Sequence, residues 1–223
     1  LDCRHSSMEV KVMNHRPSEH ASKRIVKASK KLSWLLRHGA GEVGLTMDEA
    51  GWAPISEVLE HLGIDRQGLE EVAQQNDKAR LQIDGQRVRA CQGHSLAGMP
   101  VTREALEATW ARFEGGLSIW HGTNVPAAVM IAHSGIDAGA RTHVHLAPTS
   151  KSKVGKRFNT PVLLEVSVGK LRGEGLDVFE SPNGVVLVRQ VPPSCIIGLE
   201  TTTKKANLRR GELRGLYGIA GAA

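Results

Sequence analysis

Apolar residues first recur at helical spacing between residues 21 and 38. The positions on one face of this predicted helix are Ile25, Val26, Leu32, Leu35 and Leu36. Ser22 can cap the start of the helix, and Gly39 and Gly41 end it. Residues 1–20 show no such periodicity, so we interpret them as a disordered leader.

Two further stretches, residues 55–62 and 65–73, also repeat apolar residues at helical spacing. Two strand-like segments follow at residues 79–83 and 87–90, and the Asp84-Gly85 pair between them is a strong hairpin signal. Three helices followed by a hairpin is the order of a winged-helix module. Such modules usually bind nucleic acid, although many serve only protein contacts. The pattern predicts a winged-helix lobe over residues 21–96.

The predicted hairpin is strongly basic. Its cations are Lys78, Arg80, Arg87 and Arg89. Two interpretations stay open at this point: a solvated strand face, and a wing whose cations face the phosphates of a nucleic acid.

The second half of the chain has a different pattern, in which two helical stretches are followed by many short strands. The helical stretches cover residues 103–112 and 126–134, and the strands cover residues 117–120, 141–146, 161–168, 185–188 and 195–199. This order predicts an α+β domain over residues 97–200. Residues 201–223 carry five cations among glycines, so we interpret them as a basic, mostly flexible tail.

Net charge and cysteine usage indicate the kind of partner and the compartment to expect. The chain has 223 residues, a net charge of +6 and a pI of about 9.4, which favours an acidic partner such as nucleic acid. The three cysteines are widely spaced without a CxxC pair, which fits a reducing cytoplasmic location better than a disulfide framework. Neither a membrane-spanning run nor a secretory signal core is present, and a monomer is the default expectation.

Two groups of residues are candidates for chemistry. Arg37 and His38 fall in the last turn of the first predicted helix, where they are either simple caps that suit the helix dipole or a pair for phosphate chemistry. His143-Val-His145 with His121 could supply imidazoles to zinc, but no carboxylate or cysteine lies nearby, so we expect no metal. No GxGxxG, GxxxxGK[ST] or GxSxG motif occurs, so Rossmann, P-loop and serine-hydrolase sites are not indicated.

Seven short motifs occur in order between residues 22 and 200. They are Leu32-Ser-Trp-Leu-Leu-Arg-His38, Gly51-Trp52, Arg87-Val-Arg-Ala-Cys-Gln-Gly-His-Ser95, Trp120-His-Gly-Thr123, Arg141-Thr-His-Val-His-Leu146, Val154-Gly-Lys-Arg157 and Asn183-Gly-Val-Val-Leu187. In this set the chain closely resembles the RNA 2′-phosphotransferase family. The resemblance implies a winged-helix lobe followed by a mixed β lobe of the ADP-ribosyltransferase fold.

The resemblance also implies an activity. An internal 2′-phosphate of RNA, such as a tRNA splice junction, is transferred to the co-substrate NAD through an RNA-2′-phospho-ADP-ribose intermediate. The products are 2′-hydroxyl RNA, nicotinamide and ADP-ribose 1″,2″-cyclic phosphate. The implied catalytic residues are Arg37, His38, Arg89 and Arg141. The implied NAD-binding residues are His121, Gly122, Thr123, Gly135, His145 and Asn183, with His145 preferred to His143 beside the nicotinamide.

These residue types suit the implied reaction. Arginine stays protonated and binds phosphate through a two-pronged fork, so Arg37, Arg89 and Arg141 would hold the 2′-phosphate against the charge of NAD. The second step needs proton transfer near neutral pH, which suits the imidazole of His38. Two alternatives stay open: ADP-ribosylation of nucleic-acid terminal phosphates or protein, and a winged-helix regulator with a degenerate ligand domain.

Overall fold

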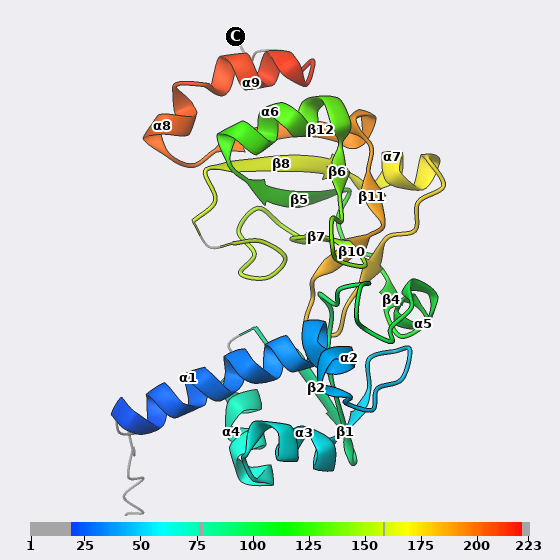
Figure 1. Cartoon of the computed structure of the whole chain (residues 1–223). Coiled ribbons are helices and arrows are strands. Elements are labelled where there is room, and N and C mark those ends of the chain that lie inside the picture. The colour runs from blue at the N-terminus through cyan, green and yellow to red at the C-terminus, as the bar shows by residue number, and fades with distance from the viewer. Residues whose placement is uncertain (1–18, 76–77, 158, 220–223) are drawn as a thin grey trace, which may run out of the picture.

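The computed structural model describes residues 19–75, 78–157 and 159–219. The expected leader lies outside the described residues except for Glu19 and His20, which begin the first helix. Mixed α and β structure is confirmed, with the helices of the N-terminal part at one end of the molecule and small antiparallel sheets in the C-terminal part (Figure 1).

The N-terminal part consists of helices beside one antiparallel sheet of strand order β1-β3-β2. Its elements are α1 (Glu19–Trp34), η1 (Leu35–Gly39), α2 (Ala40–Val43), β1 (Ala53–Pro54), α3 (Ile55–Leu62), α4 (Arg66–Gln74), β2 (Leu81–Asp84) and β3 (Arg87–Ala90). The three predicted helices and the hairpin are confirmed with bounds within two residues of those expected. The short strand β1 has no signal in the sequence.

The first predicted helix changes character at its end. α1 runs directly into η1, a π-helical turn that carries Arg37 and His38. Single π-helical turns are rare and frequently occur at functional sites. Periodicity could not distinguish this wider turn from the α-helix that precedes it.

In the C-terminal part, three small sheets of the described residues have strand orders β4-β9-β10-β7, β11-β6 and β12-β8-β5. The strands are β4 (Ala111–Arg112), β5 (Ser118–Thr123), β6 (Ile136–Asp137), β7 (Val144–Leu146), β8 (Val162–Ser167), β9 (Phe179–Glu180), β10 (Val186–Val188), β11 (Gln190–Val191) and β12 (Ile196–Thr201). The helices are α5 (Arg103–Glu107), α6 (Val125–Ser134), α7 (Val168–Gly173), η2 (Pro193–Cys195), α8 (Lys204–Asn207) and α9 (Arg210–Leu216). The helix predicted over 103–112 is wrong in its second half, because residues 111–112 pair with β9.

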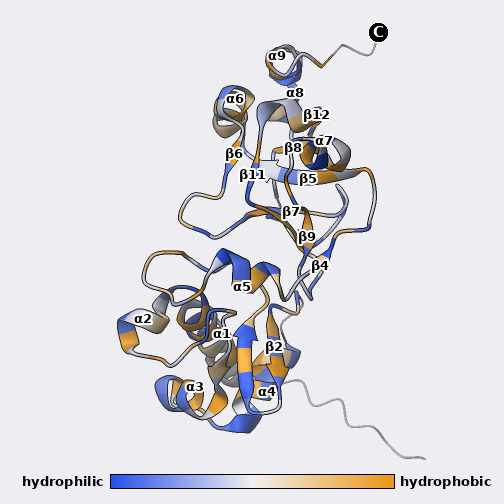
Figure 2. Ribbon diagram, turned by 90° about the vertical axis from the view of Figure 1, so that its right-hand side faces the viewer, coloured by the Kyte–Doolittle hydropathy of each residue, from blue (hydrophilic) through white to orange (hydrophobic). Residues whose placement is uncertain are grey.

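Buried apolar side chains form two clusters. One lies between the β12-β8-β5 sheet and the helices α6 and α9, and includes Ile119, Leu164 and Leu199. The other joins the N-terminal helices to α5 and β10 through Leu36, Leu106 and Leu187. Figure 2 shows apolar residues in orange on strands of both parts. Because the second cluster crosses from one part to the other, the parts are held in contact by shared packing.

We expected residues 201–223 to be a basic, mostly flexible tail. That expectation is wrong for the part of this segment that the structure describes. Residues 204–207 and 210–216 form α8 and α9, which lie over the outer side of the sheet (Figure 1). Ala206 and Leu213 are buried in the first cluster, and the Tyr217 hydroxyl donates to Ala128 O at 2.6 Å. Ala206, Leu213 and Tyr217 thus pack the segment on the rest of the C-terminal part. The many cations and glycines around them gave no sequence signal for this packing.

Replacing Leu213 by alanine is therefore expected to lower the free energy of unfolding by about 2–5 kcal/mol, because it empties a site in the core. Leu213 has 0% of its surface exposed, whereas Leu208 in the same segment is 86% exposed. Leu208→Ala is the matched control and is expected to change stability little. Urea unfolding of both variants is the measurement. Equal, small effects would contradict the packing described for α9.

Candidate active site

A cavity of about 660 Å³ lies where the two parts of the molecule meet. The N-terminal part contributes Arg37 and His38 from η1 and Lys78 and Arg80 from the start of the hairpin. The C-terminal part contributes the end of β5, strand β7, and residues 154–157 and 159–161. Among the lining residues that the structure describes, Asp137 is the single carboxylate. The cavity is therefore strongly cationic.

Arg37 and His38 point into this cavity from the π-helical turn. The Nε and Nη2 atoms of Arg37 are buried and have no hydrogen-bond partner among the described residues. Burial and the nearby charges of Arg80 and Arg141 lower the pKa of Arg37 to about 10, so its guanidinium still carries a proton at neutral pH. A buried cation without a protein partner is suited to hold an anion.

Ser95 orients the imidazole of His38. The His38 Nδ1 atom lies 2.8 Å from Ser95 Oγ, and Ser95 N donates to Arg37 O at 2.9 Å. Burial, followed by the charges of Arg37 and Arg141, lowers the pKa of His38 below its ordinary value. His38 is therefore mainly neutral at pH 7, and its Nε2 atom remains available for exchange of a proton.

Arg141 and His145 form a second pair on the opposite wall. Arg141 Nη1 lies 2.8 Å from His145 Nδ1. Since a guanidinium only donates, Nδ1 must accept and the ring proton of neutral His145 lies on Nε2. That Nε2 atom is buried without a partner among the described residues. Burial and the charge of Arg141 lower the pKa of His145 to about 3, so the imidazole is neutral.

The loop over residues 92–95 connects the two pairs. Thr142 N donates to His94 O at 2.9 Å, and Ser95 forms an isolated bridge with Arg141. Gly93 has a positive φ of 93°, and a Cβ atom there would lie 3.5 Å from Arg37 Nε and 3.6 Å from His145 Cε1. The Gln-Gly-His-Ser motif thus spaces the catalytic candidates of the two parts.

The predicted His121-Gly122-Thr123 site lies at the end of β5 and lines the cavity. His121 Nδ1 is buried without a partner among the described residues, and burial lowers the pKa of this imidazole. A Cβ atom on Gly122 would lie 2.9 Å from Thr160 Oγ1, so glycine is needed for the close approach of the two segments. A neutral imidazole and adjacent backbone are available here to a ligand.

Two further residues of the expected NAD site differ in placement. Asn183 lines the cavity, where its Nδ2 donates to Lys78 O at 2.8 Å and so joins the two parts of the chain. Gly135 is not among the residues that line the cavity, so its expected role in binding NAD stays a prediction. It has a φ of 74°, and a Cβ atom there would lie 2.3 Å from Val191 O, so it serves close backbone packing.

Arg89 is not where the catalytic expectation placed it. It is 3% exposed, and its guanidinium donates to Gln82 Oε1 at 2.8 and 2.9 Å, to Thr109 Oγ1 at 2.9 Å and to Ala50 O at 3.2 Å. It also lies over the ring of Trp52 at 4.5 Å. Arg89 is absent from the cavity lining, because these hydrogen bonds hold its guanidinium against Gln82, Thr109 and Ala50.

Arg80, and not Arg89, is the hairpin arginine that lines the cavity. It lines the cavity together with Lys78, and its charge acts directly on Arg37. The sequence left two interpretations of the basic hairpin, a solvated strand face and a phosphate-facing wing. Each fits a different part of it. Lys78 and Arg80, at the base, face the cavity, whereas Arg87 pairs with Asp84 at 3.0 Å and lies over Trp52. The sequence named Arg80 as one of four hairpin cations that could face phosphate, but it could not show which of the four would do so.

His143 also proves to have a packing role. It is 1% exposed, its Nε2 lies 2.8 Å from Glu107 Oε1, and its ring meets Trp110 edge-on at 4.9 Å between centroids. Glu107 in turn pairs with Arg189. Within the described residues, no three His, Cys, Asp or Glu side chains are grouped as metal ligands. Nor is any helix there long and apolar enough to cross a membrane.

Buried neutral imidazoles are expected to make the fold acid-sensitive. The pKa values of His94 and His145 are lowered to about 3, mainly by burial, whereas an unfolded histidine titrates near about 6.5. The unfolded chain thus binds more protons below pH 6.5, and stability present above that pH is lost as the pH falls towards 3. Each group is expected to contribute about 1.4 kcal/mol per pH unit in this window.

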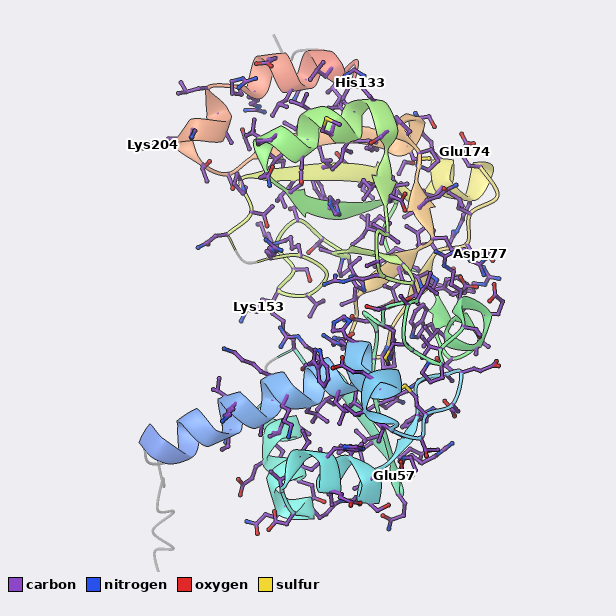
Figure 3. All side chains as sticks on the ribbon, in the orientation of Figure 1. Glu57, His133, Lys153, Glu174, Asp177 and Lys204 are labelled. Atoms are coloured by element: carbon purple, nitrogen blue, oxygen red, sulfur yellow. The ribbon has the colours of Figure 1, made fainter. Side chains whose placement is uncertain are left out.

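Denaturant unfolding between pH 7.5 and pH 5 measures this slope. Replacing His145 by asparagine should reduce the slope, because one of the histidines with a strongly lowered pKa is removed. The same substitution at the exposed His133, near the end of α6 (Figure 3), supplies the control for replacing a histidine by asparagine. A stability that is flat with pH would contradict the neutral state assigned to the buried imidazoles.

A cationic cavity with oriented imidazoles and one carboxylate defines a protein that binds phosphate-bearing substrates and performs proton-transfer chemistry on them. Comparison with known proteins makes this specific. Residues 23–190 match the model of the family described as RNA 2′-phosphotransferase, Tpt1 / KptA family. The chain belongs to this family.

Curated relatives agree with the family match. Two named "Probable RNA 2′-phosphotransferase" are similar over most of their length: one from Pseudomonas syringae pv. tomato, 39% identical over 74% of this chain and 89% of the relative, and one from Burkholderia lata, 36% identical over 81% and 94%. A third of the same name, from Rhodopirellula baltica, is 35% identical over 78% of this chain and 96% of the relative. The expected family and enzyme class are confirmed.

Proposed function

We propose that the protein transfers an internal 2′-phosphate of a tRNA-like RNA to NAD, giving 2′-hydroxyl RNA, nicotinamide and ADP-ribose 1″,2″-cyclic phosphate. The observation that carries the proposal is the convergence of Arg37, His38, Arg141 and His121 on one cavity in a chain of the RNA 2′-phosphotransferase family. The Arg37-His38 pair, His121 and Arg141 are far apart in the sequence, and their meeting in one cationic cavity supports a site for an anionic substrate.

The arrangement of elements supports two lobe identities. Helices combined with an antiparallel β1-β3-β2 sheet fit a winged-helix lobe. The small antiparallel sheets after residue 97 fit a lobe of the ADP-ribosyltransferase type. In this proposal the first lobe presents the RNA, the second holds NAD, and the boundary lies near residue 97.

The cavity fits a dinucleotide in size and in polar groups. Its volume is about 660 Å³, and it contains the unpartnered nitrogens of His121 and His145. NAD supplies the electrophilic ribose carbon and nicotinamide as leaving group. In this proposal His121, Gly122 and Thr123 hold the ribose that carries nicotinamide, and His145 Nε2–H donates beside the nicotinamide ring. Asn183 stands at the rim of the same cavity.

Arg37, Arg80 and Arg141 are proposed to hold the RNA 2′-phosphate. All three line the cavity, and Arg80 and Arg141 are close enough to lower the pKa of Arg37. An anion between them relieves this mutual repulsion and satisfies the buried Arg37 donors. Such a cage orients the phosphate for attack on the ribose carbon of NAD, and the phosphate, already anionic, needs no base. Arg80 replaces Arg89 in this role.

His38 is proposed to act in the second step. The ribose 2″-hydroxyl attacks phosphorus, the bond to the RNA 2′-oxygen breaks, and one proton moves from the hydroxyl to the leaving oxygen. A lowered pKa keeps His38 neutral at pH 7, so it can accept the hydroxyl proton and then return it. Ser95 holds the ring through Nδ1, which leaves Nε2 for the substrate.

Incubation of an oligonucleotide carrying one internal 2′-phosphate with NAD tests the proposal. Mass analysis should show loss of the 2′-phosphate with equal amounts of nicotinamide and ADP-ribose cyclic phosphate. The same oligonucleotide with a free 2′-hydroxyl is the control and should release no nicotinamide. A final product that keeps ADP-ribose on RNA would favour the ADP-ribosyltransferase alternative, and absence of NAD consumption would refute both.

A further inference from the structure

One exposed face of α1 combines cations with an aromatic ring and leads to the catalytic pair. Lys27, Lys30, Trp34 and His38 follow each other at three- or four-residue steps and are all exposed. Side chains at such steps lie on the same side of a helix. The opposite side carries Leu32 and Leu35, which are buried in the N-terminal core. We name Lys27, Lys30 and Trp34 the α1 stripe.

Trp34 packs one side of its ring against η1 and leaves the rest open to solvent. It is 39% exposed, one turn before the catalytic pair. A Cβ atom on Gly39 would lie 2.4 Å from the Trp34 ring, so the absence of a side chain there lets the indole rest against η1. The ring is thus held beside the catalytic pair while part of it stays open to solvent. Exposed aromatic rings beside cations are the usual platform for stacked bases.

A second basic segment lies across the mouth of the cavity. The loop over residues 149–157 carries Lys151, Lys153 and Arg157 as exposed cations, and its residues 154–157 line the cavity. In Figure 3 Lys153 projects from this loop on the side of α1. The 149–157 loop and the α1 stripe are thus two basic segments, one on each part of the molecule, and each is continuous in sequence with residues that line the cavity.

The hairpin does not offer an equivalent surface. Arg87 pairs with Asp84, Arg89 is buried, and Arg66 beside them donates to Glu70 and Gln86. Helices α3 and α4 add acidic residues on that side, Glu57, Glu60, Glu70 and Glu71. The exposed cations Lys27 and Lys30, by contrast, lie on the helix that runs directly into η1 and its cavity-lining residues.

We propose that the single-stranded RNA flanking the phosphorylated nucleotide binds along the α1 stripe. Lys27 and Lys30 contact its phosphates, Lys153 contacts the backbone from the opposite side, and one base stacks on Trp34. Phosphate contacts and stacking carry little sequence information, so recognition along this path is indifferent to base identity. The inference rests on the proposed function, since it identifies how that substrate is held outside the cavity.

Binding of a labelled 12-nucleotide 2′-phosphorylated RNA, followed by fluorescence anisotropy, tests the stripe. The double variant Lys27→Gln/Lys30→Gln removes two phosphate contacts and should lower the slope of log affinity against log salt by about 1.4. Trp34→Ala should weaken binding by at least about 5-fold, whereas Trp34→Phe, which keeps a stacking ring, should lose little. Turnover of a 2′-phosphorylated dinucleotide, which lacks the flanking nucleotides, should stay at the wild-type rate in the Lys27→Gln/Lys30→Gln variant.

Lys204→Gln/Lys205→Gln is the matched control, since it removes the same charge from α8 at the far end of the molecule (Figure 3). It should leave the slope unchanged. Wild-type affinity in the α1 double variant would overturn the role proposed for the α1 stripe, and so would an equal loss of affinity in the α8 control. In either case, turnover of the dinucleotide would still support the proposed function. If the wild type turned over neither substrate, the proposed function would fail, and the anisotropy comparison would still decide the binding surface.

Discussion

His38→Ala should slow the second chemical step by about 10²–10⁴-fold, the usual contribution of general acid–base catalysis, while nicotinamide release continues. The first step needs only an oriented phosphate, which the arginine cage supplies. The second needs a proton acceptor, and His38 is a neutral imidazole at the cavity, held by Ser95 at 2.8 Å. An RNA-2′-phospho-ADP-ribose intermediate should therefore accumulate in a mass time course with excess NAD.

His121→Ala is the contrasting variant. His121 lies on the wall of the cavity proposed for NAD, and it is not hydrogen-bonded to Ser95 or to the catalytic pair. Its loss should weaken the use of NAD and slow the first step, with little intermediate. If His38→Ala completed both steps at the wild-type rate, His38 would be only a helix-end residue. If it blocked both steps equally, its role would be binding.

Exchanging single arginines of the hairpin should separate catalysis from folding. Arg80→Gln is expected to lower kcat/KM by about 10²–10³-fold, the range seen when one preorganised donor to a developing charge is removed. Its stability should change little, because Arg80 lines the open cavity. Arg89→Gln should instead lower the free energy of unfolding by about 2 kcal/mol or more, because buried acceptors lose their donor.

Turnover measured on the folded fraction and urea unfolding of the same samples are the two readouts. The hydrogen bonds of Arg89 to Gln82, Thr109 and Ala50 predict that its variant, once folded, retains most activity. A catalytic collapse in folded Arg89→Gln with a fully active Arg80→Gln would restore the assignment made from the sequence motif. It would also show that the cavity closes differently around substrate.

The terminal segment shows one limit of pattern reading. Residues 204–216 contain glycines at Gly211 and Gly215 and several cations, which locally disfavour helix and core alike. The segment nevertheless forms α8 and α9, because Leu213 and Ala206 find a hydrophobic surface on distant strands. Tertiary packing therefore makes this segment helical, although its local helix propensity is weak.

Local periodicity determined the helices of the N-terminal part and the Asp84-Gly85 hairpin, because both depend on neighbours within a few residues. The ordered motifs determined the family and named Arg37, His38, Arg141, His121 and His145, which the fold brings to one cavity. The choice between Arg80 and Arg89 was left to the tertiary structure. Arg80 lies just before β2 and Arg89 within β3, so sequence could not say which guanidinium the sheet turns towards the cavity. That depends on the contacts of Arg89 with Thr109 and Trp52, residues far from it in the chain.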